Sequence, residues 1–329
     1  MHYLIIGLIL VIIELTYFRL AVIFNITDNP NHRSSHTKPT IRGGGIIFPL
    51  AILGYALEEH PASLWWLAGL LMISLISFLD DIISLPNRLR ITVHLIAVSL
   101  LFYDLHLFRL WPIVLILLTY ILVIGTINAW NFMDGINGIT VLYCLSTIIT
   151  LAYLNTQYTF ADNQLIFITG IAALIFGFFN CRRKAACFAG DVGAVSIAFI
   201  LVFLMLSLMA ITNNPIFILL FAVYGVDSVM TICYRLFRKE NIFKAHRSHL
   251  YQLMANECRI PHLLVSTIYF IIQLLVNILV ISILAFTVRM QWVIGAAILV
   301  VLVSIYWTMR YRLMRNALVD SIPPVVKHI

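Results

Sequence analysis

The sequence has little charge for its length. Only 11% of its 329 residues are Asp, Glu, Lys or Arg, whereas 62% are hydrophobic. Soluble globular domains carry about 25% charged residues, and a chain of this size cannot hide so much apolar surface in a water-soluble core. The composition therefore excludes a disordered chain, a collagen, a coiled coil and an ordinary soluble domain. It indicates an integral membrane protein.

Cysteine is also scarce, and its spacing lacks any paired or metal-binding pattern, which argues against a disulfide framework and a zinc site. The five cysteines are Cys144, Cys181, Cys187, Cys233 and Cys258. The formal net charge of +7 is typical of nucleic-acid binders, but in a membrane protein it more often reflects basic loops on the cytoplasmic side. We therefore expect a lipid bilayer as partner and no nucleic acid.

The apolar runs are long and alternate only weakly, so they predict helices rather than barrel strands. The first run has almost no basic flank and no small-residue cleavage site, which predicts a retained helix. We expect an all-α polytopic membrane protein forming a single domain over residues 1–329, with about eleven transmembrane helices. These are predicted near residues 1–24, 43–57, 62–79, 91–104, 111–127, 139–154, 164–180, 192–211, 216–234, 263–287 and 291–308.

Basic residues divide unevenly between the two sets of predicted loops. One set holds eighteen of the 21 Lys and Arg residues, which predicts that this side is cytoplasmic, with the N-terminus outside and the C-terminus inside. These residues are Arg33, Lys38, Arg42, Arg88, Arg90, Arg182, Arg183, Lys184, Arg235, Arg238, Lys239, Lys244, Arg247, Arg259, Arg310, Arg312, Arg315 and Lys327.

Carboxylates, amides and imidazoles gather on the same predicted side. A set of such groups at one membrane surface suits a site for a charged, water-soluble substrate. The set comprises Asp80, Asp81, Asn128, Asn131, Asp134, Asn137, Asp191, His246 and His249.

Two adjacent carboxylates, Asp80 and Asp81, follow the apolar run at 62–79. A solvated helix end would explain them without any function. However, carboxylates at a helix C-terminus oppose the helix dipole and repel each other, and adjacent residues point about 100° apart. Mg²⁺ binding or a proton-accepting role would justify the pair.

Amides and glycine dominate the segment 128–138. On a helical turn the three-residue spacing places Asn128, Asn131 and Asp134 on one face, and hard oxygen donors on one face suit a magnesium-bound diphosphate. The alternative is a turn with Asn or Asp as a helix cap. That alternative explains Asp134-Gly135 and one Asn, but not the remaining polar side chains.

Two glycine-containing segments could let a phosphate approach the backbone. Gly190-Asp191-Val192-Gly193 opens the predicted helix at 192–211, where Asp191 would also be a good N-cap. Arg42 precedes three consecutive glycines, and such a run beside basic side chains can cradle anions. An inside-positive membrane anchor is the alternative for this second segment.

The longest predicted cytoplasmic loop contains His246-Arg247-Ser248-His249. If it is helical, the two histidines share a face. Because no other Cys or His has suitable spacing for zinc, imidazole and guanidinium donors for a diphosphate are favoured. A basic loop held against anionic lipid headgroups is the alternative. Asp227 is an intramembrane acid, for which a functional role and pairing with Arg235 are both open.

Taken in order, these segments resemble the polyprenyl-phosphate N-acetylhexosamine-1-phosphate transferases. The matching pieces are Pro39-Thr40 with Arg42-Gly43-Gly44, Asp80-Asp81, Asn128-x-x-Asn131-x-x-Asp134-Gly135, Gly190-Asp191-x-Gly193 and His246-x-x-His249. The segment from His246 to Gln252 looks most like the O-antigen-initiating branch. The chain departs from the family pattern at Asn137, where many bacterial members carry Asp, at Ala194, where many carry Ser, and at Cys181-Arg-Arg-Lys184.

The resemblance implies transfer of an N-acetylhexosamine-1-phosphate from a UDP-sugar to undecaprenyl phosphate, with release of UMP. This would be the initiating step of a cell-surface glycan such as O-antigen, at the bacterial inner membrane with the active site facing the cytoplasm. It further implies Mg²⁺ as cofactor, with Mn²⁺ as an alternative, held by Asn131 and Asp191. Asp80, Asp81 and Asp191 would be catalytic, and substrate would be bound by Arg42, Asn128, Asp134, His246, Arg247 and His249.

Several alternatives remain open at this level. Asp80 or Asp81 would act as a base, or an aspartate would act as a nucleophile in a double displacement. A transporter of an anionic substrate and a non-catalytic membrane scaffold are the rival functions, although a transporter predicts polar residues near the bilayer midplane and inverted repeats. A homodimer is also open.

Overall fold

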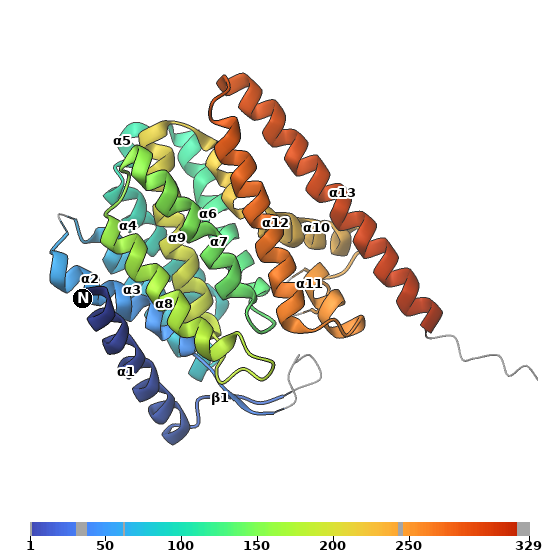
Figure 1. Ribbon diagram of the computed structural model, residues 1–329, viewed down its shortest axis with the longest axis horizontal. Coiled ribbons are helices and arrows are strands. Elements are labelled where there is room, and N and C mark those ends of the chain that lie inside the picture. The colour runs from blue at the N-terminus through green and yellow to red at the C-terminus, as the bar shows by residue number, and fades with distance from the viewer. Residues whose placement is uncertain (1, 31–37, 62, 243–245, 321–329) are drawn as a thin grey trace, which may run out of the picture.

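The computed structural model describes residues 2–30, 38–61, 63–242 and 246–320. The basic residues Arg33, Lys244 and Lys327, which entered the orientation argument, lie outside these residues. Long helices packed side by side build the molecule, from α1 at one edge to α13 at the other (Figure 1). The chain is an all-α polytopic membrane protein, and its only strands in the described residues form one short antiparallel pair.

The helices and strands occur in the following order along the chain: α1 (His2–Ile23), β1 (Thr27–Asp28), β2 (Thr40–Ile41), the 3₁₀ turn η1 (Gly44–Ile46), α2 (Ile47–Glu59), α3 (Trp65–Ile82), α4 (Asn87–Asp104), α5 (Leu107–Leu110), α6 (Ile113–Met133), α7 (Ile139–Tyr158), α8 (Asn163–Asn180), α9 (Gly190–Thr212), the 3₁₀ segment η2 (Pro215–Phe221), α10 (Ala222–Phe237), α11 (Leu250–Gln252), the π-helical turn η3 (Leu253–Glu257), α12 (His262–Ile283) and α13 (Val288–Asp320).

Every one of the eleven predicted apolar segments contains a helix. In the part of the chain that is described, nine helices are long and apolar enough to cross a membrane. The other two segments correspond to α2, which has only 13 residues, and to α4, which carries Arg88, Arg90 and Asp104. The count of eleven spans and the orientation of the chain therefore stay predictions.

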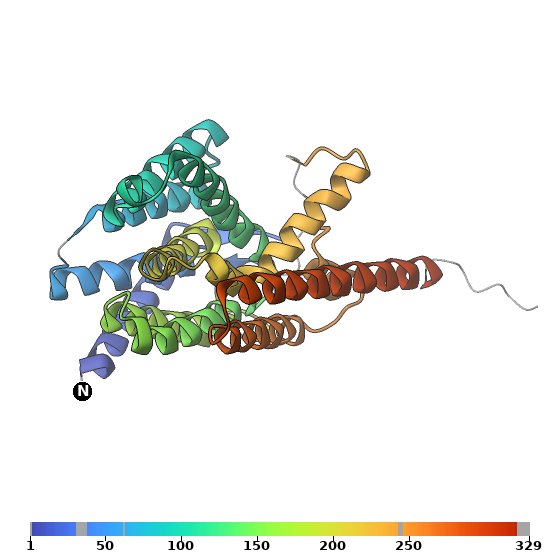
Figure 2. The ribbon, with the colours of Figure 1, turned by 90° about the horizontal axis from the view of Figure 1, so that it is seen from above.

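Helix α9 is the centre of the molecule. Seen from above, it lies between a layer containing α3, α4 and α6 and a layer containing α7, α8 and α12 (Figure 2). All its side chains from Val192 to Leu208 are buried. A helix surrounded on every side must be apolar all round, which explains why this segment is the most hydrophobic of the chain.

The predicted ninth span is not one continuous helix, because the 3₁₀ segment η2 precedes α10. The first N–H groups of a helix have no partner within it, and inside a membrane they must be satisfied by other groups. Here the backbone N–H of Val223 donates to Oε1 of Gln273 (3.0 Å), and that of Tyr224 donates to the hydroxyl of Tyr143 (3.2 Å). The Tyr143 hydroxyl in turn donates to Gln273 (2.6 Å). Side chains of α7 and α12 thus cap the interrupted helix.

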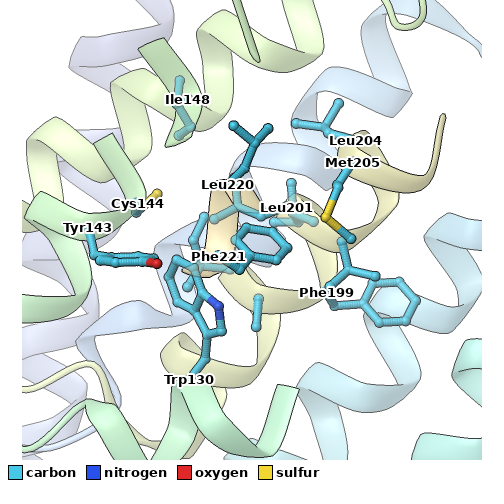
Figure 3. Close-up of a cluster of buried hydrophobic side chains, with 14 of the residues drawn as sticks. Trp130, Tyr143, Cys144, Ile148, Phe199, Leu201, Leu204, Met205, Leu220 and Phe221 are labelled. Carbon is cyan, nitrogen blue, oxygen red and sulfur yellow. The ribbon is translucent and has the colours of Figure 1, made fainter. Parts of the chain in front are cut away.

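An aromatic cluster packs beside this junction. The buried Trp130 ring meets Tyr143 at 5.4 Å, Tyr224 at 5.1 Å and Phe221 at 5.9 Å in edge-on geometry, and Figure 3 shows Trp130 and Tyr143 converging on Phe221 and its neighbours. Such geometry is the favourable one for aromatic rings. The cluster therefore anchors the end of α6, immediately before Asn131.

We predict that Gln273→Leu destabilises the protein by about 1–3 kcal/mol, because it leaves the Val223 N–H and the Tyr143 hydroxyl buried without their acceptor. Thermal unfolding of the purified protein in detergent measures the loss. Ser282→Ala is the control, since that hydroxyl bonds to the Ile278 carbonyl on the exposed face of the same helix. Equal midpoints for the two variants would contradict the capping role of Gln273.

Candidate active site

Two glycine segments lie against each other and form the floor of the site. The Phe188 N–H donates to the Ile41 carbonyl (2.8 Å), and the Gly44 N–H donates back to the Phe188 carbonyl (2.9 Å). A Cβ added to Gly193 would lie 2.6 Å from the Cα of Gly45, which is closer than real Cβ atoms come. Glycine at these positions therefore lets the two backbones touch, and this contact brings Arg42 beside Asp191. We call the end of the bundle that carries these segments the site end.

Asp81 joins these segments to the end of α3. Its carboxylate accepts the backbone N–H groups of Asp191 (2.8 Å) and Val192 (3.0 Å), which are the free donors at the start of α9. It also meets Nε of Arg42 at 2.6 Å. A carboxylate at a helix N-terminus is favourable because it satisfies unpaired N–H groups and the helix dipole. The side chain of Asp81 is 0% exposed, so its role in the structure is to hold Arg42 and α9.

Asp80 points elsewhere, as expected for an adjacent helical residue, and pairs with a residue that sequence analysis had not assigned to the site. Nη1 of Arg90 lies 2.6 Å from its Oδ2, and the Leu85 N–H donates to its Oδ1 (2.8 Å). The turn between α3 and α4 is short, so the first turn of α4 folds back beside the carboxylates. The sequence signal for this contact is that Arg90 follows the Asp80-Asp81 pair by only a few residues. In the sequence alone, Arg90 serves only to predict which side of the membrane its loop faces.

Asp191 is where the two arginines meet. Nη2 of Arg42 lies 3.2 Å from its Oδ1, and Nη2 of Arg90 lies 3.2 Å from its Oδ2. Buried charges are stable only when they are paired and hydrogen-bonded. The three carboxylates and two guanidiniums satisfy this condition, because each carboxylate oxygen has a donor. We call the five side chains of Arg42, Asp80, Asp81, Arg90 and Asp191 the acid–arginine cluster.

Helix α1 contacts the acid–arginine cluster through the backbone of Arg42. The hydroxyl of Tyr17 donates to the Arg42 carbonyl (2.5 Å). Sequence analysis missed this contact, because a tyrosine in an apolar helix resembles any other lipid-facing or packed aromatic residue.

The predicted common face of Asn128, Asn131 and Asp134 is only partly confirmed. Asn131 and Asp134 lie close enough to Asp191 to act on it electrostatically. The amide of Asn128 instead donates to the Ile124 carbonyl of its own helix (2.8 Å). No described contact links Asn128 with the acid–arginine cluster.

Asp134 is the C-cap of α6 and accepts a hydrogen bond from Thr140 (2.5 Å) at the start of α7. Burial raises the pKa of its carboxyl from 3.8 to about 6, opposed by the Thr140 hydrogen bond and reinforced by the charge of Asp191. This carboxyl therefore changes charge close to neutral pH, unlike an ordinary aspartate.

Asn137, which departs from the family pattern, has a structural explanation. Its amide donates to the Arg182 carbonyl (2.8 Å), which an ionised Asp could not do. The carbonyl of Asn137 accepts from Ser266 (2.8 Å). Asn137 thus ties the 181–184 loop to the start of α12.

The His246–His249 segment is not helical, so the helical arrangement considered for the two histidines does not apply. Their rings nevertheless stack with centroids 5.1 Å apart, because the extended loop folds back before α11. Burial, with the nearby His249 and Arg235, lowers the pKa of His246 to about 4, so it is neutral at pH 7. Nη1 of Arg310, from α13, donates to the Ser248 carbonyl (2.7 Å) and fixes the loop, which also contains Arg247.

The histidine loop reaches the acid–arginine cluster through the last turn of α6. The hydroxyl of Tyr251 donates to the Phe132 carbonyl (2.8 Å), and the ring of Phe132 lies 6.5 Å from that of His249. Asn131 and Asp134, on either side of Phe132, face Asp191. The five sequence motifs therefore meet around one end of the helix bundle.

Magnesium needs hard oxygen donors, and the predicted ligands Asn131 and Asp191 are neighbours here. The Nδ2 atom of Asn131 is buried without a hydrogen bond of normal geometry among the described residues, so this amide still has a polar group to satisfy beside Asp191. Those residues include no group of three or more His, Cys, Asp or Glu that could hold a metal alone. The pair therefore fits Mg²⁺ in the mode in which one or two protein oxygens share the ion with substrate phosphates.

A polytopic all-α chain with carboxylates, arginines and histidines at one end has the polar groups that a membrane enzyme for phosphate-containing substrates requires. The family model for glycosyl transferase family 4 matches residues 63–209. The match includes Asp80, Arg90, Asn131 and Asp191, but neither Arg42 nor the histidine loop.

Two relatives extend this result. The undecaprenyl-phosphate alpha-N-acetylglucosaminyl 1-phosphate transferase of Escherichia coli K12 is 28% identical over 257 residues, which cover 70% of this chain and 69% of that enzyme. The phospho-N-acetylmuramoyl-pentapeptide-transferase of Streptococcus pyogenes serotype M1 is 28% identical over 206 residues, 52% of this chain and 59% of that enzyme. The chain is thus similar to the polyprenyl-phosphate hexosamine-1-phosphate transferases, and these matches support the resemblance that its motifs indicated. Its relatives are transferases, so the transporter and scaffold alternatives gain no support.

We predict that Gly193→Ala lowers the thermal midpoint and abolishes ligand binding at the site, because its Cβ would push the two glycine segments apart. Thermal unfolding, with and without UMP, measures both effects. Gly54→Ala is the control, since a Cβ there meets nothing within 4 Å and alanine is favoured over glycine within a helix by about 1 kcal/mol. A Gly193→Ala protein as stable as Gly54→Ala would refute the backbone contact.

The raised pKa of Asp134 also predicts that the stability of the protein depends on pH. Because its pKa is raised to about 6 in the fold, the folded state binds more protons than the unfolded state between about pH 4 and pH 6, and stability from this group falls as pH rises through that range. Asp134→Asn removes the titration. The stability of the wild type relative to Asp134→Asn should therefore decline from pH 4 to pH 6, as measured by thermal unfolding, and a constant difference would disprove the raised pKa.

Proposed function

We propose that this chain transfers an N-acetylhexosamine-1-phosphate from a UDP-sugar to undecaprenyl phosphate, giving undecaprenyl-diphosphate-sugar and UMP. Such a reaction would start a cell-surface glycan, for which O-antigen is our preferred candidate on the pattern of the His246–Gln252 segment. The observation that carries the proposal is the acid–arginine cluster at one end of a membrane helix bundle. The names of the relatives, which specify sugar-1-phosphate transfer to a polyprenyl phosphate, support the same chemistry.

The reaction forms one P–O bond and breaks another. An oxygen of the lipid phosphate attacks the sugar-bearing phosphorus, and the diphosphate P–O bond to UMP breaks, so UMP leaves with the bonding electrons. Two anions have to meet, so neutralising charge is the main task of the protein. Arg42 and Arg90 are suited to this task because guanidinium forks match phosphate oxygens. His246, Arg247 and His249 would bind the diphosphate from the other side.

The three aspartates are not equally accessible. The side chain of Asp81 is 0% exposed, whereas those of Asp80 and Asp191 are 11% and 18% exposed. We therefore propose Asp80 and Asp191 as the carboxylates that meet substrate, and Asp81 as the residue that positions them through Arg42 and the start of α9. Asp80 would accept a proton from the lipid phosphate or attack phosphorus itself. A base would accelerate the reaction only slightly, because the second pKa of a phosphate is about 6 and most of the lipid phosphate is already deprotonated at pH 7.

Mg²⁺, with Mn²⁺ as an alternative, would be held by Asp191 and Asn131 and would withdraw charge from the diphosphate. Asp134, whose charge varies near neutral pH, would adjust the negative potential beside that pair.

The site end is proposed to face the cytoplasm of a bacterial inner membrane. Arg42, Arg88, Arg90, Arg182 and Arg310 lie in or beside the loops at this end, and basic loops are retained on the cytoplasmic side. A UDP-sugar, which is water-soluble and cytoplasmic, would then enter from that side, and the polyprenyl chain would lie along the apolar helices.

We predict that Asp191→Ala and Asp80→Asn each lower kcat by at least about 100-fold, because each removes a charge that organises the arginines around the reacting phosphates. Purified protein, undecaprenyl phosphate, Mg²⁺ and a panel of UDP-sugars are the assay, with the lipid product identified by mass spectrometry. Glu58→Gln, an exposed carboxylate paired with His2 near the opposite end, is the matched control. Near-normal turnover by both site variants would reject the proposed function.

A further inference from the structure

A carboxylate outside the acid–arginine cluster organises the histidine loop. Asp227, in α10, is 2% exposed and lies within a span-length apolar segment. Intramembrane acids are costly to bury and usually functional. The suggested pairing with Arg235 is not what is seen, because that guanidinium bonds to Glu240 and to the carbonyls of Asn241 and Ile242.

Asp227 instead accepts hydrogen bonds from five groups of the surrounding elements. They are Nδ1 of His249 (3.3 Å), the N–H groups of Leu250 (3.0 Å) and Tyr251 (3.3 Å), and the hydroxyls of Thr231 (3.1 Å) and Tyr269 (2.6 Å). The two backbone N–H groups can only donate, so the carboxylate is an acceptor toward the whole loop. In this arrangement Nδ1 of His249 carries a proton that it donates to Asp227. The other ring nitrogen, Nε2, is left to bind a different group.

The other ring nitrogen, Nε2 of His249, is buried and makes no hydrogen bond to any described residue. A buried polar atom without a partner is rare in native proteins and calls for an explanation. The His249 residue is 3% exposed, its ring stacks on His246, and it lies beside Phe132, between Asn131 and Asp134 in sequence. An unsatisfied nitrogen held at this place fits an acceptor that arrives with the substrate.

We propose that Asp227 is a positioning residue, which holds the Nδ1–H of His249 so that Nε2, carrying its own proton when the anionic substrate is bound, donates to a phosphoryl oxygen of that substrate. This inference rests on the proposed function for the identity of that substrate. The logic is that of any carboxylate–histidine pair, in which the acid sets which ring nitrogen is available. The two histidines of the motif then differ, since His249 is oriented by a buried anion and His246 is not.

The tautomer can be read directly by NMR of ¹⁵N-histidine-labelled protein, with His249→Gln used to assign the signals. We expect a protonated Nδ1 at His249 in the wild type and its loss in Asp227→Asn, whose amide can donate toward Nδ1. Tyr269→Phe is the matched control, because it removes a bond to Oδ2 of Asp227 and leaves the Oδ1 bond to His249 intact. An unprotonated Nδ1 of His249 in the wild type would overturn the proposal, whether or not Asp227→Asn folds.

The same samples test what Nε2 binds. Adding inorganic pyrophosphate with Mg²⁺ should move the Nε2 signal of the wild type and of Tyr269→Phe from the unprotonated to the protonated position, whereas Nε2 of Asp227→Asn is already protonated and should move much less. No shift in the wild type would overturn the assignment of Nε2 to a phosphoryl oxygen. This arm requires no turnover, so it separates failure of this inference from failure of the proposed transferase reaction.

Kinetics distinguish positioning from a purely structural role. Asp227→Asn and His249→Gln should each lower kcat by roughly 10- to 100-fold. If Asp227 acts through His249, the double variant should be no slower than the slower single variant, since the effects of residues that act as a unit are not additive. Losses that multiply in the double variant would show that Asp227 only supports the fold, and would refute the proposal.

Discussion

The meeting of Arg42 and Arg90 on one carboxylate, Asp191, is the interaction on which the site depends. Three aspartates crowded at helix ends would repel one another, and their burial is tolerable only because two guanidiniums pair with them. The same pairing ties together the loop before α2, the end of α3, the start of α4 and the start of α9. Charge neutralisation therefore builds the tertiary structure at this end and also supplies the groups that a diphosphate requires.

Close backbone contact is the second constraint. The arginine can reach Asp191 only because Gly45 and Gly193 allow two chain segments to touch. On the other side of the site, the segment around Phe132 faces two ways, with Asn131 and Asp134 toward Asp191 and with the Phe132 carbonyl toward Tyr251. The end of α6 thus joins the acid–arginine cluster to the histidine loop.

Much of this could be predicted from individual residues. Long apolar runs predicted the helices, and the order of short polar motifs predicted that Asp80, Asp191 and the histidines would share one end. The predictions failed where contacts override local pattern. Asn128 satisfies its amide within its own helix, although its spacing favoured the site. The span at 216–234 is interrupted, since Gln273 and Tyr143 cap N–H groups that a continuous helix would have satisfied itself.

The amino-acid sequence is enough to predict a polytopic helical membrane protein whose polar side chains collect at one end, because hydrophobic length and residue type are local properties. Only the tertiary structure decided which partners meet. Arg90 and Asp191 are 101 residues apart, and Tyr17 and Arg42 are 25 residues apart. Nor does any local pattern reveal that Asp227 faces His249 rather than Arg235. Such pairings are set by how helices pack and how loops return, and packing depends on the whole chain at once.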